Sequence, residues 1–103
     1  MMNSVEHFLR IRGNTCENCN EPFTRENWPE RHHCIKGRSK HRPEFDEDVN
    51  ISLVCRKCHA SGEVDSYEYK QVFAMRQVNR GYFIKEWYQS LDLKAPEQWL
   101  LNL

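Results

Sequence analysis

Apolar positions recur every three or four residues near both ends of the chain, which is the spacing of one face of a helix. Close to the amino terminus, this spacing predicts a short helix over residues 5–11. Asn3 or Ser4 can cap its start, because either side chain accepts a hydrogen bond from the free N–H groups of the first turn. Gly13 is expected to end it.

The carboxy-terminal half shows the same spacing twice. It predicts one helix from a cap at Asp65 or Ser66 to Asn79, and a second over residues 82–91. Pro96 can open a last helical turn, since the first position of a helix does not need the N–H that proline lacks. We expect the aromatic side chains on these helices to pack in a core rather than to stack on bases.

Between the helices, apolar residues occur only in short runs that are typical of strands. Strands are predicted over residues 30–35 and 49–54, and a further helix is expected to begin close to Cys55. Residues 36–48 are polar, contain a glycine and a proline, and are predicted to form a long loop. A loop of this length inside a small domain usually has a function.

Composition narrows the class of protein. The chain has 103 residues, 39% hydrophobic and 29% charged, which indicates one globular domain over residues 1–103. Fifteen basic residues balance fifteen acidic ones, which excludes binding of nucleic acid by bulk charge alone. No stretch approaches the roughly 18 apolar residues of a membrane helix. Residues 1–13 lack a signal-peptide core, so we expect a cytoplasmic protein.

The cysteines indicate a structural metal site. Four of the five form two Cys-x-x-Cys pairs, Cys16 with Cys19 and Cys55 with Cys58. Two such pairs can give a zinc ion four thiolate ligands and leave no open position, which defines a structural site. Two independent redox pairs, or plain buried thiols, are the alternatives. Cys34 has no partner at this spacing and is predicted to be a buried thiol.

Charge is unevenly distributed along the predicted loop. Residues 31–42 hold five Lys or Arg side chains, three histidines and no acid, and four acids follow within residues 44–48. Such a run is often a solvated surface. Its position beside a histidine pair instead favours phosphate binding, for which Arg38 and Lys40 are the candidates.

The histidines complete a recognisable order. His32 and His33 are adjacent, Asn50 follows 17 residues after His33, and His59 stands directly after Cys58. Together with the two cysteine pairs, this order resembles the zinc-finger subgroup of the HNH endonucleases, which are named for histidine, asparagine and histidine. The resemblance covers residues 16 to about 60, somewhat under half of the chain.

The resemblance implies a fold and an activity. The fold would be a small zinc-stabilised α+β domain with a ββα-metal core over residues 16–63, an added amino-terminal helix and a helical extension over residues 64–103. The activity would be metal-dependent hydrolysis of DNA. By resemblance, His33 is the general base, and His32 and His59 hold a catalytic Mg²⁺ or Mn²⁺. Asn50 would brace the loop and orient His33 by hydrogen bonding.

One position departs from the family. Many relatives have another histidine one helical turn after the residue that matches His59, where this chain has Glu63. If the helix continues, Glu63 shares a face with His59 and could be an oxygen ligand. If Gly62 ends the helix, Glu63 is a solvated acid.

The expected partner is double-stranded DNA. Small HNH proteins of this kind resemble those of bacteriophages and mobile elements, some of which work with a DNA-packaging enzyme in the host cytoplasm. The alternative is a zinc-stabilised module that binds nucleic acid or another protein without catalysis. The four intact residues His32, His33, Asn50 and His59 favour the nuclease, whereas the neutral overall charge favours the module.

Overall fold

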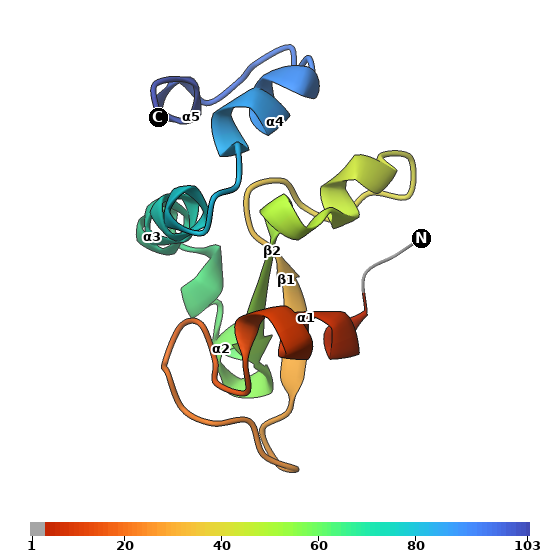
Figure 1. The fold of residues 1–103 in the computed structure, drawn as a ribbon, viewed down its shortest axis with the longest axis vertical. Helices are drawn as coiled ribbons and strands as arrows, with labels where there is room; N and C mark the ends of the chain where they lie inside the picture. Colours follow the sequence, from red (N-terminus) through yellow and green to blue (C-terminus); the bar gives the residue numbers. More distant parts are fainter. Residues whose placement is uncertain (1–3) are drawn as a thin grey trace.

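A two-stranded antiparallel hairpin lies at the centre of the computed structural model, which describes residues 4–103. Strand β1 (Pro29–His33) pairs with β2 (Ile51–Cys55), in a register from Pro29 opposite Cys55 to His33 opposite Ile51. All five residues of β2 are buried. Figure 1 shows the hairpin between helix α1 (Val5–Arg12) and helix α3 (Tyr67–Asn79).

Both faces of β2 are covered because successive side chains of a strand point in opposite directions. Ile51 and Leu53 pack against Phe8 of α1, and all three are 0% exposed. Val54 faces the main core, which includes Phe73 of α3. This small sheet therefore has a fixed position relative to the helices on both sides.

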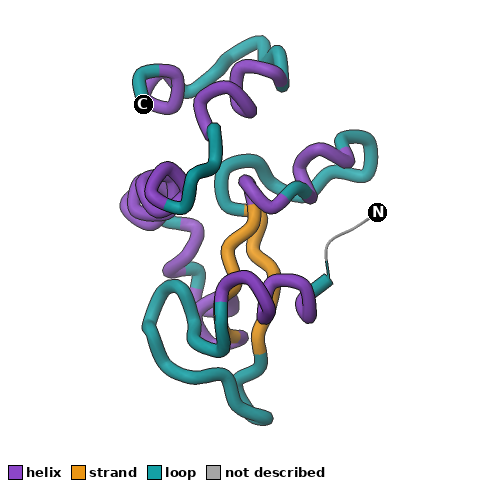
Figure 2. Tube along the Cα trace, viewed as in Figure 1, coloured by secondary structure: helices purple, strands orange, loops and turns teal. Residues whose placement is uncertain are grey.

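The remaining helices follow the hairpin in sequence. Helix α2 (Arg56–Ser61) begins directly after β2, and α4 (Ile84–Ser90) and α5 (Gln98–Leu101) lie beyond α3. The main core contains Ile84 and Tyr88 from α4 and Leu100 from α5. Figure 2 shows a long loop from α1 to β1, and a connection from β1 to β2 that contains short helical turns. No helix in residues 4–103 has the length and apolar character needed to cross a membrane.

The helix boundaries confirm the capping predictions. Ser4 accepts a hydrogen bond from the backbone N–H of His7, and Ser66 accepts one from that of Tyr69. Asn3, the alternative cap, lies outside the described residues. Gly13 ends α1 with a φ of 95°, a conformation that glycine adopts without strain.

The strands are shorter at the loop end than predicted. Strand β1 ends at His33 rather than at residue 35, and β2 begins at Ile51 rather than at residue 49. The reason is that the backbone N–H groups of Ile35 and Lys36 donate to the side chain of Asn50 instead of to a strand. A 3-10 turn, Asp48–Asn50, occupies the predicted start of β2.

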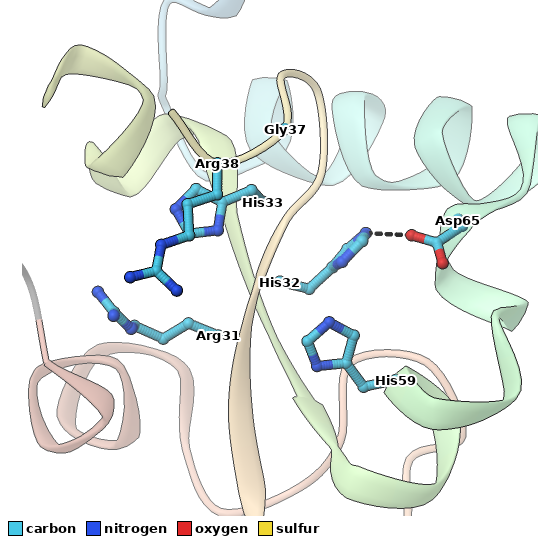
Figure 3. A pocket seen from close by; sticks show the side chains of 7 residues that line it. All are labelled: Arg31, His32, His33, Gly37, Arg38, His59 and Asp65. Carbon is cyan, nitrogen blue, oxygen red and sulfur yellow. Dashed lines mark ion pairs between the residues drawn. The ribbon is translucent and has the colours of Figure 1, made fainter. Parts of the chain in front are cut away.

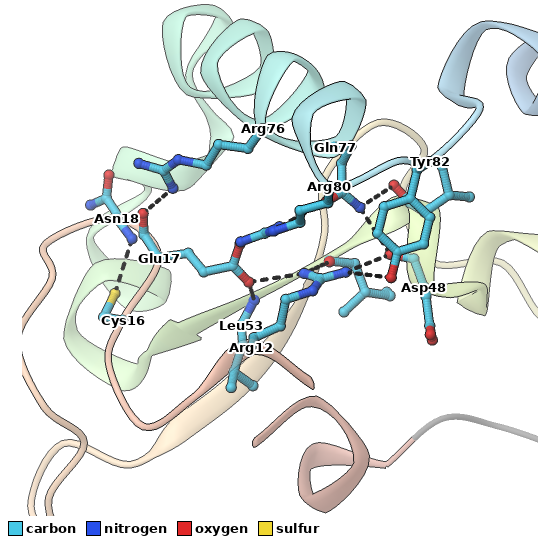
Figure 4. Close-up of polar contacts among 12 residues, drawn as sticks. Arg12, Cys16, Glu17, Asn18, Asp48, Leu53, Arg76, Gln77, Arg80 and Tyr82 are labelled. Atoms are coloured by element: carbon cyan, nitrogen blue, oxygen red, sulfur yellow. Dashed lines mark hydrogen bonds and ion pairs between the residues drawn. The ribbon is translucent and has the colours of Figure 1, made fainter. Parts of the chain in front are cut away.

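A buried charge network joins α1, the first cysteine pair and α3 (Figure 4). Glu17, which is 7% exposed, accepts hydrogen bonds from Arg12 at 3.0 Å and from Arg80 at 2.7 Å. Arg12 also donates to the backbone carbonyl of Ile51 at 2.7 Å. A buried carboxylate is tolerated only when it is paired in this way. The network therefore holds the loop of the first cysteine pair against β2 and α3.

Candidate functional site

Two separate groups of side chains could carry chemistry, and the first is the cysteine cluster. The Sγ atoms of Cys16, Cys19, Cys55 and Cys58 all lie within 4.8 Å of one another. Cys55 is the last residue of β2 and Cys58 lies in the first turn of α2, so the end of the hairpin positions the second pair. Four sulfur donors gathered in this way fit the ligand set of a structural zinc ion. The cluster can thus hold a metal such as zinc, as the spacing predicts.

The thiols of the cluster differ in how readily they lose a proton. Burial raises the pKa of Cys58 to about 12. Burial acts in the same direction on Cys55, but hydrogen bonds, the largest from the backbone N–H of Cys58, lower the pKa of Cys55 to about 7. The protein alone therefore stabilises one thiolate more than its neighbour, and a bound divalent cation would deprotonate both. Cys34 is 7% exposed, its pKa is raised by burial, and it lies outside the cluster.

The second group surrounds a pocket of about 310 Å³ at the loop end of the hairpin. Its walls come from β1, the following loop, α2 and the turn after α2, and they comprise Arg31, His32, His33, Gly37, Arg38, His59 and Asp65. In Figure 3, His32, His59 and Asp65 lie on one side of β1. His33 and the two arginines lie on the other side. The alternation of side chains along a strand separates His32 from His33 in this way.

His32 has the properties of a metal ligand. It is 5% exposed, and its ring centroid lies 5.3 Å from that of His59. Burial lowers the pKa of His32, and the carboxylate of Asp65, with Oδ1 3.8 Å from Nε2 of His32, offsets this only in part. A lowered pKa keeps the imidazole neutral at physiological pH. A neutral imidazole is the form that binds a metal ion.

His59 is oriented by a carboxylate that the sequence did not single out. Its Nδ1 lies 2.8 Å from Oε1 of Glu30. Burial raises the pKa of Glu30, but hydrogen bonds from Trp28 and His59 outweigh this and lower it, so Glu30 is a carboxylate and only accepts. Nδ1 of His59 therefore donates in this hydrogen bond, which leaves Nε2 as the ring nitrogen that could face a metal ion. This carboxylate–histidine pairing is common behind metal-binding histidines.

His33 has a different partner. Its Nε2 lies 2.6 Å from Oδ1 of Asp46, which belongs to a 3-10 turn, Pro43–Asp46, in the loop between the strands. The contact is mostly buried, with side-chain exposures of 12% for His33 and 20% for Asp46. The two adjacent histidines thus have distinct surroundings. His32 faces the imidazole of His59 and has Asp65 at 3.8 Å, whereas His33 forms a close contact of 2.6 Å with Asp46.

Asn50 acts on the loop and not on His33. Its Oδ1 accepts from the N–H groups of Ile35 and Lys36, and its Nδ2 donates to the carbonyls of Lys36 and Phe45, all at 2.7 to 2.9 Å. These contacts satisfy the side chain, which is 0% exposed. The expected hydrogen bond from Asn50 to His33 is therefore wrong, because Asp46 takes that place.

Replacing Asn50 with alanine is expected to lower the free energy of unfolding by about 3 kcal/mol, because several buried backbone groups of the loop lose their partners at about 1–3 kcal/mol each. Chemical denaturation of the zinc-loaded protein, followed by circular dichroism, measures this. Asn79→Ala, at an exposed position, is the control and should change stability by less than about 0.5 kcal/mol. Equal stability of the two variants would contradict the bracing role.

Glu63 does not reach the histidine pocket. Gly62, with a φ of 81°, ends α2, so the helical spacing from His59 does not extend to Glu63. Oε2 of Glu63 instead accepts a hydrogen bond from Asn18 at 2.9 Å, beside the cysteine cluster. Glu63 as a ligand of the catalytic metal is therefore wrong. Asp65, expected only as a helix cap, is the carboxylate that lines the pocket.

The two predicted phosphate contacts differ in position. Arg38 lines the pocket, on the side of β1 that also carries His33 (Figure 3). Lys40 is exposed and is not part of the pocket wall.

Comparisons with known proteins give no match: no family model, no curated protein and no solved structure is similar to this chain. The chemistry of the site is therefore inferred from its own residues and from the order of its motifs.

Proposed function

We propose that this protein is a metal-dependent endonuclease that hydrolyses phosphodiester bonds of DNA. The observation that carries the proposal is that three histidines, two arginines and a carboxylate line one pocket between β1, the loop after it, α2 and the turn after α2. Hydrolysis of a phosphodiester needs a base for water, positive charge at the phosphate and stabilisation of the leaving oxygen. The residues of this pocket can supply each requirement, and their order resembles that of the HNH endonucleases.

His33 is the proposed general base. Asp46 holds its Nε2, so the ring keeps one orientation and the other nitrogen can accept a proton from water. Arg38 binds the phosphate oxygens from the same side of β1 and holds the scissile bond within reach of that water. Proton transfer and phosphate binding are thereby assigned to the side of the strand opposite His32.

His32, His59 and Asp65 are the proposed ligands of a catalytic divalent cation. Their donor set, two imidazoles and one carboxylate, fits such an ion, and the oxygen ligand favours Mg²⁺ or Mn²⁺. The Asp65 oxygen and the His32 nitrogen are 3.8 Å apart, wider than the separation of about 3.0 Å between adjacent octahedral ligands with bonds of about 2.1 Å, so binding of the ion would draw these two groups together. When bound, the cation would act as a Lewis acid toward the phosphate and the leaving oxygen.

Incubation of the purified protein with supercoiled plasmid tests the proposal directly. With Mg²⁺ or Mn²⁺ we expect conversion to nicked or linear DNA, and without added divalent cation we expect none. Loss of the plasmid conversion in His59→Ala would assign the activity to this protein and not to a contaminant. Absence of cleavage with either cation would contradict the nuclease proposal.

The positions of the two loop cations predict unequal effects on DNA binding. Arg38→Ala is expected to weaken binding similarly for all sequences and to reduce the salt slope by about one, as expected for one lost phosphate contact. Lys40→Ala should have the smaller effect, since Lys40 is exposed outside the pocket. Fluorescence anisotropy at several salt concentrations measures both. If neither variant changes the affinity or the slope, this part of the loop is only a solvated surface.

A zinc-stabilised binding module without catalysis is the second candidate. The balance of fifteen basic and fifteen acidic residues favours it, because DNA binding then depends on a local patch. In residues 4–103, moreover, the four cysteines form the one gathered group of metal-binding side chains. This candidate predicts binding of DNA or protein without cleavage of plasmid, so the same assay separates the two.

A further inference from the structure

Trp28 is a half-exposed aromatic residue that shares the carboxylate of Glu30 with His59, a proposed metal ligand. The residue is 47% exposed, and it directly precedes β1 in the sequence. The indole N–H donates to Oε2 of Glu30 at 2.9 Å, and the other oxygen of Glu30 contacts His59 at 2.8 Å. One carboxylate thus fixes the orientation of both the exposed indole and a proposed metal ligand.

The strand aligns Trp28 with the histidine pocket. Side chains two residues apart share a face of a strand, so Trp28, Glu30 and His32 follow one another along the same side of β1. The backbone carbonyl of Trp28 accepts a hydrogen bond from Arg56, which extends the pairing with β2 by one residue. At about 3.3 Å per strand residue, Trp28 lies roughly 13 Å from His32. This distance corresponds to about four nucleotides at 3.4 Å each.

The positively charged side chain of Arg56 lies close to the indole of Trp28. Nη1 of Arg56 lies 3.7 Å from Oε2 of Glu30, the oxygen that also holds the Trp28 ring, and the Arg56 side chain is 53% exposed. An accessible ring with an accessible guanidinium beside it suits a nucleotide. The ring can stack on a base while the cation contacts the phosphate.

We propose that Trp28 stacks on an unpaired base of the DNA that the pocket cleaves, with Arg56 on the adjoining phosphate. This inference rests on the proposed nuclease function and adds a substrate class: DNA with an unstacked or unpaired nucleotide within about four positions of the scissile phosphate, as at a gap or a flap. A continuous duplex keeps its bases stacked in its interior and offers the indole no free face.

Binding measurements on the zinc-loaded 103-residue chain test the proposal. All variants are made in the His33→Ala background, which prevents cleavage. The probes are a labelled duplex and the same duplex with a two-nucleotide gap. We expect tighter binding of the gapped DNA. Trp28→Ala should weaken binding to the gapped DNA about tenfold and change binding to the continuous duplex little. Trp28→Phe should retain most of the preference, because phenylalanine keeps a ring that stacks.

Matched variants separate stacking from other roles. Phe83→Ala removes an aromatic ring that is 76% exposed and lies away from the pocket, and it should leave both affinities unchanged. Equal losses in Trp28→Ala and Trp28→Phe would overturn the stacking proposal, because both remove the hydrogen bond to Glu30. Unchanged binding in Trp28→Ala would overturn it as well.

Plasmid cleavage tests the nuclease function separately from the binding measurements. If the unmodified protein cleaves plasmid while Trp28→Ala binds both probes as its parent does, only the stacking proposal fails. If the unmodified protein neither cleaves plasmid nor binds either probe, both proposals fail.

Discussion

Replacing Cys16 with serine is expected to leave the chain without a stable fold. Cys16 is 0% exposed, and its sulfur accepts hydrogen bonds from the backbone N–H groups of Asn18, which lies within the first cysteine pair, and of Cys55, which belongs to the second. A structural zinc site contributes about 10 kcal/mol or more, comparable to the whole stability of a small domain. Loss of one ligand therefore removes most of the folding free energy.

Far-ultraviolet circular dichroism and elemental analysis together measure this effect. The unmodified protein should contain about one zinc per chain and should unfold when a strong chelator removes it. Cys34→Ala is the matched control, because Cys34 is also buried but lies outside the cluster, and it should cost only about 1–2 kcal/mol. Freshly purified, folded protein without zinc would refute a structural zinc site.

The second large effect concerns cleavage and separates a base from a metal ligand. His33→Ala is expected to lower the rate of plasmid nicking by a factor of roughly 10² to 10⁴, which is the usual contribution of a general base. It should still bind Mn²⁺ and DNA, because His33 is paired with Asp46 and lies across β1 from His32 and His59. His59→Ala should lose both nicking and Mn²⁺ affinity while the cysteine cluster keeps the fold intact.

Asp46 extends this test to the partner of His33. Asp46→Ala is expected to reduce nicking by about 10- to 100-fold without changing Mn²⁺ affinity, because it orients the ring and does not touch the ion. Calorimetric titration with Mn²⁺ on zinc-loaded protein supplies the metal readout for all three variants. Full nicking activity in His33→Ala would reject the proposed mechanism and favour the non-catalytic module.

Features that depend only on neighbouring residues could be predicted from the sequence. Helix spacing and the caps at Ser4 and Ser66 predicted α1 and α3. The Cys-x-x-Cys spacing predicted that two thiols of each pair could serve one ion. Helix capping and a two-residue turn between thiols are local geometry, which is why a sequence pattern can report them.

Which carboxylates face the histidines depends on contacts between segments that are far apart in the sequence. Asp46 reaches His33 across 13 residues and Glu30 reaches His59 across 29, and no periodicity relates such positions. Glu63 is a position where the local pattern gave the wrong carboxylate. Helical spacing predicted Glu63 on the same face as His59. The left-handed conformation of Gly62 ends α2 before that position, and Asp65 lines the pocket instead. Local pattern therefore identified the imidazoles and thiols, whereas the folding of the loops around the hairpin selected the acids beside them.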